Sequence, residues 1–232
     1  SIRRQRQMCI RDRINSYVRY VQENPQELDI LFKELLIGVT SFFRDPGAWQ
    51  RFGKQILPEL MASRPAGTVL RAWVAGCSTG EEAYSLAILM AEAQEALKQS
   101  FKVQVFATDI DGQAIAIGRA GLYPASIASD LSPERLARFF TAEPENNSYR
   151  IHKSIRDLLV FSEQDVIKDP PFSKLDMISC RNLMIYMGGE LQRKLLPLFH
   201  YALNPGGVLF LGTSETIGDH ADLFSTVDRK AK

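Results

Sequence analysis

The stretch Leu70-Arg-Ala-Trp-Val-Ala-Gly-Cys-Ser-Thr-Gly-Glu-Glu-Ala-Tyr84 decides the fold class of this chain. The apolar run 69–75 predicts a buried parallel strand, Gly76 and Gly80 predict a tight turn, and a helix is expected from Glu81 onward. Strand, glycine turn and helix open a nucleotide-binding α/β unit, in which glycines let the backbone approach a ligand. The spacing is GxxxG rather than the dinucleotide fingerprint GxGxxG, so an ordinary turn between strand and helix remains an alternative.

Strands and helices alternate from this stretch to the end of the chain. The expected strands cover 69–75, 102–108, 158–162, 174–179 and 208–211. The expected helices cover 80–98, 112–120, 132–140 and 189–203. A small hairpin is expected to pair 149–151 with 155–157. The alternation predicts an α/β fold with a doubly wound, mostly parallel sheet and right-handed crossovers.

A helical segment precedes the sheet. One helix is expected over 26–37, and another from Pro46, with Asp45 as its N-cap. We divide the chain into an N-terminal helical segment, 1–64, and a ligand-binding domain, 65–232. Residues 1–20 hold six arginines and one aspartate, which indicates either a solvated helix face or a contact surface for an acidic partner. The ends of the sequence suggest a fragment of a longer protein.

Composition narrows the class of protein. The 232 residues carry a formal net charge of +1, which gives no overall attraction to nucleic acid or anionic lipid. Three cysteines without metal-ligand spacing predict neither zinc nor a disulfide framework, and free thiols suit the cytoplasm. No signal peptide and no bilayer-spanning apolar run is found in the sequence, so membrane insertion is not expected.

Polar residues gather where the expected strands end, which is where open α/β sheets bind ligands. Asp109 follows the second strand and either accepts hydrogen bonds from ribose hydroxyls or caps the next helix, for which Asp111 is the better candidate. The third strand is followed by Gln164-Asp165-Val166, where a side-chain carboxylate or amide is placed to pair with an adenine amino group. Arg181 and Asn182 follow the fourth strand and are expected to face a cleft, solvent or a partner, of which we favour the cleft. No histidine lies at a strand end, and no triphosphate-binding loop occurs.

Five ordered motifs then resemble one family. They are Thr40-Ser-Phe-Phe-Arg44, Ala75-Gly-Cys-Ser-Thr-Gly-Glu-Glu-Ala-Tyr-Ser85, Ala107-Thr-Asp-Ile-Asp111, Cys180-Arg-Asn-Leu-Met-Ile-Tyr186 and Asn204-Pro-Gly-Gly-Val-Leu-Phe-Leu-Gly212. In this order they resemble the chemotaxis-receptor methyltransferase (CheR) family, over about residues 28–228. The likeness is greatest to the methyltransferase modules of hybrid signalling proteins. It implies a Rossmann-like class I fold and a bacterial, cytoplasmic enzyme that uses S-adenosylmethionine to methylate receptor glutamates, leaving S-adenosylhomocysteine.

The resemblance also implies roles for single residues. Thr40, Arg44 and Glu82 would contact the methionine end of the cofactor beside the Gly76 turn, and Asp109 would hold the ribose. The remaining cofactor residues would be Asp165 and Val166 beside the adenine, and Arg181 and Asn182. Arg44 and Tyr186 would stand nearest the acceptor carboxylate and form the catalytic pair.

The implied methyl transfer to a glutamate carboxylate needs few functional groups from the enzyme. A glutamate carboxylate, with a pKa of roughly 4.3, is already ionised near neutral pH and needs no general base. Correct alignment of carboxylate, methyl group and sulfur can contribute roughly 7–11 kcal/mol. Arg44 would hold the acceptor, and Tyr186 would fix one of its oxygens by a hydrogen bond.

The sequence departs from the family pattern in places. Gly38 stands where an asparagine is usual, so one cofactor hydrogen bond is lost or supplied by water. Asp165 also replaces a common asparagine. Residues 141–157 contain no glycine, which argues against the tail-peptide docking of some members. The expected partner is instead a helical receptor region, contacted through the basic N-terminal helix.

Two other functions remain open. Asp169-Pro-Pro-Phe172 resembles the DPPF motif of amino-methyltransferases that act on adenine in nucleic acid, but it precedes the fourth strand rather than following it. A proline-rich loop that enters a strand is the simpler interpretation, and the neutral charge also argues against nucleic acid. The other alternative is a non-catalytic module that senses the cofactor and signals by contact.

Overall fold

The structure, a computed structural model, describes residues 14–24, 26–27, 31, 38–65, 67–218 and 220–228. By its internal contacts the chain divides into two compact units, Ser1–Val39 and Thr40–Lys232. The first unit contains α2 (Ile14–Glu23). Residues 1–13, with five of the six N-terminal arginines, and most of the expected helix over 26–37 lie outside the described residues. The domain boundary after residue 64 stays a prediction, although the helices just before it belong to the larger unit.

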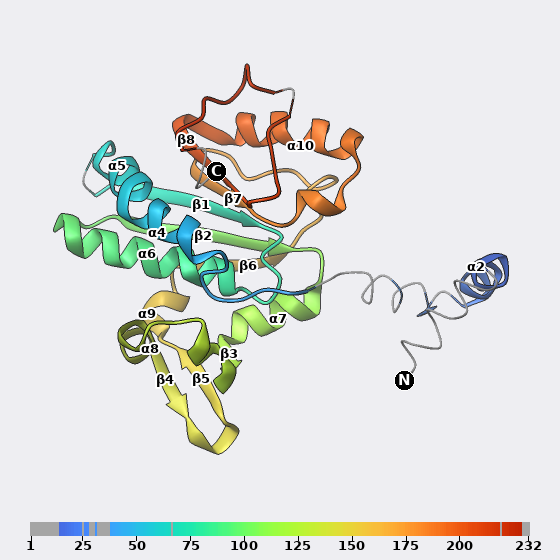
Figure 1. Cartoon of the computed structure of the whole chain (residues 1–232), viewed down its shortest axis with the longest axis horizontal. Coiled ribbons are helices and arrows are strands. Elements are labelled where there is room, and N and C mark those ends of the chain that lie inside the picture. Colours follow the sequence, from blue (N-terminus) through green and yellow to red (C-terminus); the bar gives the residue numbers. More distant parts are fainter. Residues whose placement is uncertain are drawn as a thin grey trace. The chain divides into compact units, whose positions relative to one another are not determined.

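A five-stranded sheet forms the centre of the larger unit, in the order β6-β2-β1-β7-β8 (Figure 1). All of its pairings are parallel. Its strands are β1 (Val69–Ala75), β2 (Lys102–Asp109), β6 (Leu159–Glu163), β7 (Leu175–Cys180) and β8 (Leu203–Leu211). The predicted parallel sheet is therefore confirmed, and β8 begins earlier than its expected bounds.

Helices cover both faces of this sheet, as the doubly wound prediction requires (Figure 1). On one face, α6 (Glu81–Leu97) and α7 (Gly112–Ala120) pack into an apolar core that includes Leu86 and Val105. On the other face, α10 (Gly189–Ala202) packs into a second apolar core. Within the described residues no helix has the length and apolar character needed to cross a bilayer.

The helical region before β1 departs from its prediction in one respect. It consists of α4 (Pro46–Arg51), a π-helical turn η1 (Phe52–Ile56) and α5 (Leu57–Ala62). Asp45 occupies the N-cap position of α4, but its side chain makes no capping hydrogen bond. Its Oδ2 instead accepts a hydrogen bond from Arg181 Nη2 at 2.9 Å. The predicted capping role is therefore wrong, because a charged partner distant in sequence has taken the carboxylate.

A small antiparallel sheet with the order β3-β5-β4 stands apart from the main one (Figure 1). Its strands are β3 (Leu122–Pro124), β4 (Phe140–Glu143) and β5 (Ser148–Ile151), and α8 (Pro133–Phe139) precedes β4. The expected hairpin between 149–151 and 155–157 is wrong, since β5 pairs with β4 and β3. Residues 153–156 form a helical turn, α9 (Lys153–Arg156).

Position 80, at the end of the turn after β1, requires glycine because of both its packing and its backbone geometry. Its φ of +96° lies in the left-handed region, which costs other residues free energy. A Cβ atom there would lie 2.9 Å from Phe161 Cε1 and 3.2 Å from Gly118 Cα. The turn can therefore lie directly against β6 and α7 only with glycine at this position.

We expect Gly80→Ala to lower the free energy of unfolding by roughly 2–4 kcal/mol, because positive-φ strain adds to overpacking. Thermal unfolding followed by circular dichroism measures this loss. Gly47→Ala is the matched control, since a Cβ at Gly47 would meet no atom within 4 Å. Equal melting temperatures for the two variants would contradict the packing account.

Candidate functional site

The parallel strands end along one edge of the main sheet, and the turn after β1 lies there (Figure 1). The backbone N–H groups of Gly76 and Cys77 both donate to Thr108 O, at 2.8 and 2.9 Å. This pair of hydrogen bonds holds the turn against the end of β2. Gly76 and Ser78 adopt φ values of +72° and +49°, so the turn is tightly folded.

Asp109, the last residue of β2, fixes this turn through its carboxylate. Its Oδ2 accepts from Ser78 N at 2.7 Å, and its Oδ1 accepts from Asp111 N at 3.0 Å. Asp111 in turn caps α7, because its Oδ1 accepts from Gln113 N at 2.8 Å. Asp109 is therefore not the helix cap. A carboxylate has about four acceptor positions, so each oxygen of Asp109 keeps one for a ligand hydroxyl.

Glu82, in the first turn of α6, is a carboxyl group held at the end of β7. Its Oε1 accepts from Ser179 Oγ at 2.7 Å, and its Oε2 lies 3.9 Å from Arg181 Nη1. Burial raises the pKa of Glu82 to about 7, although the nearby cations of Arg181 and Arg44 oppose this rise. Glu82 therefore changes charge near neutral pH.

The side chain of Arg181 is buried, contrary to its prediction. Its side chain is 0% exposed, so the prediction that it faces a cleft is wrong. The guanidinium carbon lies 5.2 Å from the ring centre of Trp49 and 4.9 Å from that of Phe210. Its Nη2 donates to Arg44 O at 3.0 Å as well as to Asp45. Arg181 thus holds the 44–45 segment by hydrogen bonds and places its positive charge beside Glu82.

The segment 40–44 lies over the start of α6 and is fixed mainly by its two phenylalanines. Phe43 N donates to Ser85 Oγ at 2.9 Å. The Phe42 ring packs edge-to-face on Tyr123 of β3, with ring centres 5.1 Å apart. The Tyr123 hydroxyl also donates to Thr79 O in the glycine turn at 2.7 Å. The small sheet therefore supports both the 40–44 segment and the glycine turn.

The other predicted residues lie at neighbouring strand ends. Thr40 and Arg44 are partly exposed on the 40–44 segment. Asn182 is the second residue after β7 and has a φ of +60°. Tyr186 ends the 3₁₀ turn η4 (Met184–Tyr186), and 58% of its surface is exposed. Gly38 belongs to the smaller unit, so its relation to this edge is not described.

Asp165 uses its side chain to order the loop that follows β6. Its Oδ1 accepts from Ile167 N at 3.0 Å and from Lys168 N at 3.2 Å. Its backbone N–H donates to Asp169 Oδ2 at 2.8 Å. Val166, the next residue, packs beside the second apolar core. An adenine contact by Asp165 would therefore use the acceptor positions that these hydrogen bonds leave.

The DPPF motif has a structural role in the same loop. Phe172 stacks on Phe106 with ring centres 4.2 Å apart, and packs edge-to-face on Trp73 at 5.5 Å. The aromatic residue of the motif is thus turned into the core face of the sheet. This geometry favours the interpretation of the motif as a proline-rich loop that leads into β7.

Sequence reasoning missed two residues that support this edge, Tyr123 and Glu215. Tyr123 has no local sequence signal, because it contacts Thr79 and Phe42, which are distant from it in sequence. Glu215 lies shortly after β8 and is 3% exposed, with its carboxylate at the backbone of the segment after β7. The strand-end rule that selected Asp109 would also have selected Glu215.

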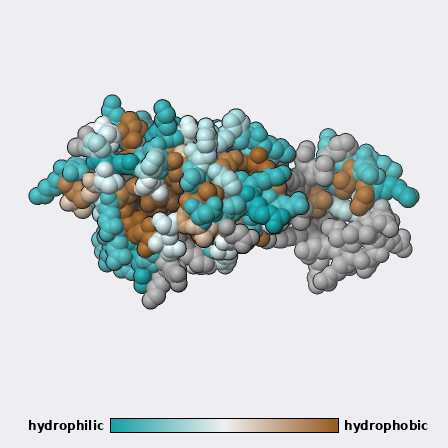
Figure 2. Space-filling model, turned by 90° about the horizontal axis from the view of Figure 1, so that it is seen from above, coloured by the Kyte–Doolittle hydropathy of each residue, from teal (hydrophilic) through white to brown (hydrophobic). Residues whose placement is uncertain are grey.

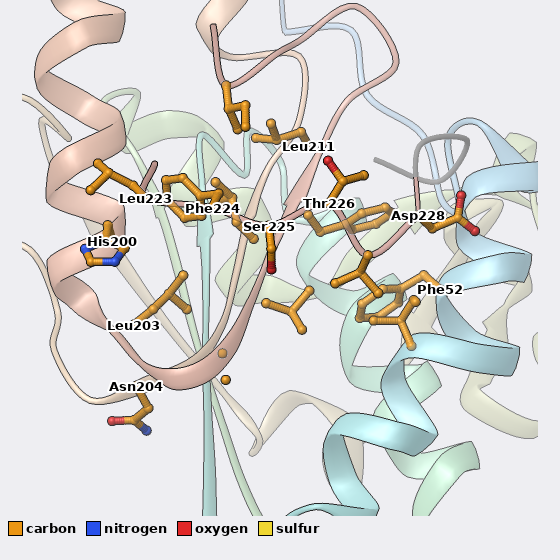
Figure 3. Close-up of a pocket in the computed structure, with 18 of the residues that line it drawn as sticks. Phe52, His200, Leu203, Asn204, Leu211, Leu223, Phe224, Ser225, Thr226 and Asp228 are labelled. Atoms are coloured by element: carbon orange, nitrogen blue, oxygen red, sulfur yellow. The ribbon is translucent and has the colours of Figure 1, made fainter. Parts of the chain in front are cut away.

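A pocket of about 750 Å³ lies away from the predicted residues (Figure 3). It runs along β8 and is lined mainly by apolar side chains, among them Phe52, Leu203 and Phe224. Apolar side chains are also exposed on this face in Figure 2. None of the predicted cofactor or catalytic residues lines this pocket.

Comparisons with known proteins agree with the geometry. Residues 38–232 match the family model described as "CheR methyltransferase, SAM binding domain". The chain is 35% identical over 192 residues to "Chemotaxis protein methyltransferase 1" of Pseudomonas aeruginosa, covering 81% of this chain and 69% of that protein. It is 31% identical over 212 residues to "Chemotaxis protein methyltransferase 2" of Vibrio cholerae, covering 90% and 72%.

A further relative is an uncharacterised 104.1 kDa protein of Rhodobacter capsulatus, 39% identical over 217 residues. This match covers 94% of the chain but only 23% of the relative. The family model covers most of the chain and includes the glycine turn, Asp109 and Glu82. The chain therefore belongs to the CheR methyltransferase family and carries its S-adenosylmethionine-binding domain.

Proposed function

We propose that this chain transfers methyl groups from S-adenosylmethionine to glutamate side chains of a chemoreceptor or a related bacterial signalling protein. The names of two relatives support a role in chemotaxis. The observation that carries the proposal is Asp109, whose carboxylate is fixed by Ser78 N and Asp111 N and keeps acceptor positions for a sugar. It lies at the tip of β2, where nucleosides bind in open α/β sheets.

The residues at this edge fit the cofactor group by group. We assign the ribose to Asp109, and the ammonium and carboxylate of the methionine end to Glu82, Thr40 and Arg44. We assign the adenine to the neighbourhood of Asp165 and Val166. Asn182 completes the pocket, whereas buried Arg181 acts by positioning Glu82 and the 44–45 segment. When bound, S-adenosylmethionine supplies a methyl group that the acceptor glutamate takes as an ester, leaving S-adenosylhomocysteine.

This chain's contribution to the reaction is mainly orientation and charge. An acceptor glutamate with a pKa of roughly 4.3 arrives ionised, so no general base is needed. Arg44 attracts and holds the acceptor carboxylate, and the exposed Tyr186 hydroxyl donates a hydrogen bond to one oxygen. Holding the carboxylate in line with the methyl group can contribute roughly 7–11 kcal/mol. We place this activity in the cytoplasm, where receptor signalling helices lie.

Arg44→Ala and Tyr186→Phe test the acceptor side of the site. Because these side chains orient the acceptor, we expect each change to lower turnover by roughly 10–100-fold while cofactor affinity falls less. The assay measures transfer of a labelled methyl group to a receptor cytoplasmic fragment. Tyr201→Phe is the matched control, since Tyr201 is 78% exposed near the far end of α10.

The chemistry of the labelled product separates the possible functions. Base-labile label on protein supports glutamyl methyl esters. Label on nucleic acid would instead support the amino-methyltransferase alternative, and cofactor binding without transfer would support the sensing module. Unchanged turnover in both variants would remove Arg44 and Tyr186 from the proposed catalytic pair.

The pKa of Glu82 makes cofactor binding depend on pH. With a pKa of about 7, Glu82 is mostly protonated at pH 6 and mostly ionised at pH 8. Only the ionised form attracts the ammonium group of the cofactor. We therefore expect affinity for S-adenosylhomocysteine to rise roughly tenfold from pH 6 to pH 8, and Glu82→Gln to bind weakly with a flat profile. Titration calorimetry measures this, and a flat wild-type profile would contradict the assignment.

A further inference from the structure

The segment 182–187 carries Tyr186, and the carboxylate of Glu215 holds its first half. Glu215 Oε1 accepts from Leu183 N at 2.9 Å and from Met184 N at 2.8 Å. Its Oε2 accepts from Asn182 N at 2.9 Å and from Gly212 N at 2.7 Å. The carboxylate therefore joins the backbone after β7 to the backbone after β8.

This arrangement requires both a carboxylate and a nearby glycine. Four N–H donors match the roughly four acceptor positions of an ionised carboxylate, whereas a glutamine amide would turn its own N–H₂ group toward two of them. A Cβ at Gly212 would lie 2.6 Å from Glu215 Oε2 and 3.0 Å from Asn182 N. Glycine at this position therefore lets the carboxylate reach the segment.

Gln192, on α10, holds the second half of the same segment. Its Nε2 donates to Met184 O and to Met187 O, both at 2.9 Å. The two side chains thus bind opposite groups of one short turn, since Glu215 takes its N–H groups and Gln192 its carbonyls. Tyr186, 58% exposed, is anchored little by packing of its own, so the backbone beneath it decides where its hydroxyl points.

We propose that Glu215 and Gln192 are positioning residues that hold segment 182–187 rigid, so that Tyr186 is already oriented when an acceptor arrives. The inference rests on the proposed function, because it gives Tyr186 its role at the acceptor. Neither residue contacts the reacting groups in this account. Both act by lowering the freedom of the backbone, which matters because small misplacements near a reacting group can cost roughly a hundredfold in rate.

Glu215→Gln and Gln192→Glu each replace a side chain whose hydrogen-bonding groups match the backbone by one of nearly the same size whose groups do not. We expect turnover to fall roughly 10–100-fold, with affinity for S-adenosylhomocysteine changed by less than about threefold. Affinity is measured at pH 8, where Glu82 is mostly ionised, because the charge of Glu215 also raises the pKa of Glu82. Glu190→Gln is the control, since Glu190 is exposed on the first turn of α10.

Hydrogen exchange of the backbone amides of residues 182–187, followed by mass spectrometry, tests the same proposal without any substrate. We expect at least about tenfold faster exchange in both variants, since unprotected amides open more often. Gln192→Glu keeps the test available if Glu215→Gln does not fold. An inactive wild-type chain would contradict the proposed function, and exchange alone would then decide the positioning. Unchanged exchange, or equal losses of affinity and turnover, would overturn the proposal.

Discussion

The rest of the site depends on the interactions of the buried Arg181 guanidinium. It packs against the rings of Trp49 and Phe210 and pairs with Asp45, so the segment before α4 is joined to the end of β7. The same cation lies beside Glu82 and lowers its pKa against the effect of burial. Removing one partner of such a group leaves an unpaired buried charge, which is far more costly than losing an exposed ion pair. One side chain therefore holds the 44–45 segment and also favours the ionised form of Glu82.

Carboxylates fix the loops around this edge by accepting hydrogen bonds from the loop backbone. Asp109 accepts hydrogen bonds from backbone N–H groups after β1 and β2, Asp165 accepts them from its own loop after β6, and Glu215 accepts them from the segments after β7 and β8. These charge-assisted hydrogen bonds are stronger than neutral ones, and they fix the backbone of these loops. In our account Asp109 also serves the ligand, because each of its oxygens keeps an acceptor position that the backbone does not use. Structural and functional use of one acidic side chain are thus compatible here.

Much of the fold follows from local sequence patterns. The apolar run 69–75, the glycine turn and Asp111 predict β1, α6 and the start of α7, because apolar period, φ > 0 and capping are local properties. The small sheet was mispredicted because β4 shows no alternation, with exposed Thr141 and Ala142 side by side, and it starts directly after α8. The strand over 149–151 was expected to pair with residues 155–157 after it, whereas it pairs with β4, which comes before it.

Long-range pairing explains what local patterns could not predict at the site. Asp45 has the sequence of a helix cap, yet its partner Arg181 is 136 residues away. Arg181 follows a strand as a ligand-facing residue would, but it is buried against Trp49 and Phe210, two rings that are distant from it in sequence. Asp109 was found because strand ends are visible in the sequence, whereas Tyr123 supports the glycine turn from a separate sheet.

The central claim is that the cofactor lies across the tips of the parallel strands, with its sugar on the acid at the end of β2. A crystal structure of the chain with S-adenosylhomocysteine tests it most directly. The account predicts ribose hydroxyls within hydrogen-bond distance of the Asp109 carboxylate, with the amino-acid end beside Glu82. A nucleoside bound instead in the apolar pocket along β8, or an Asp109 carboxylate that contacts no sugar, would contradict it.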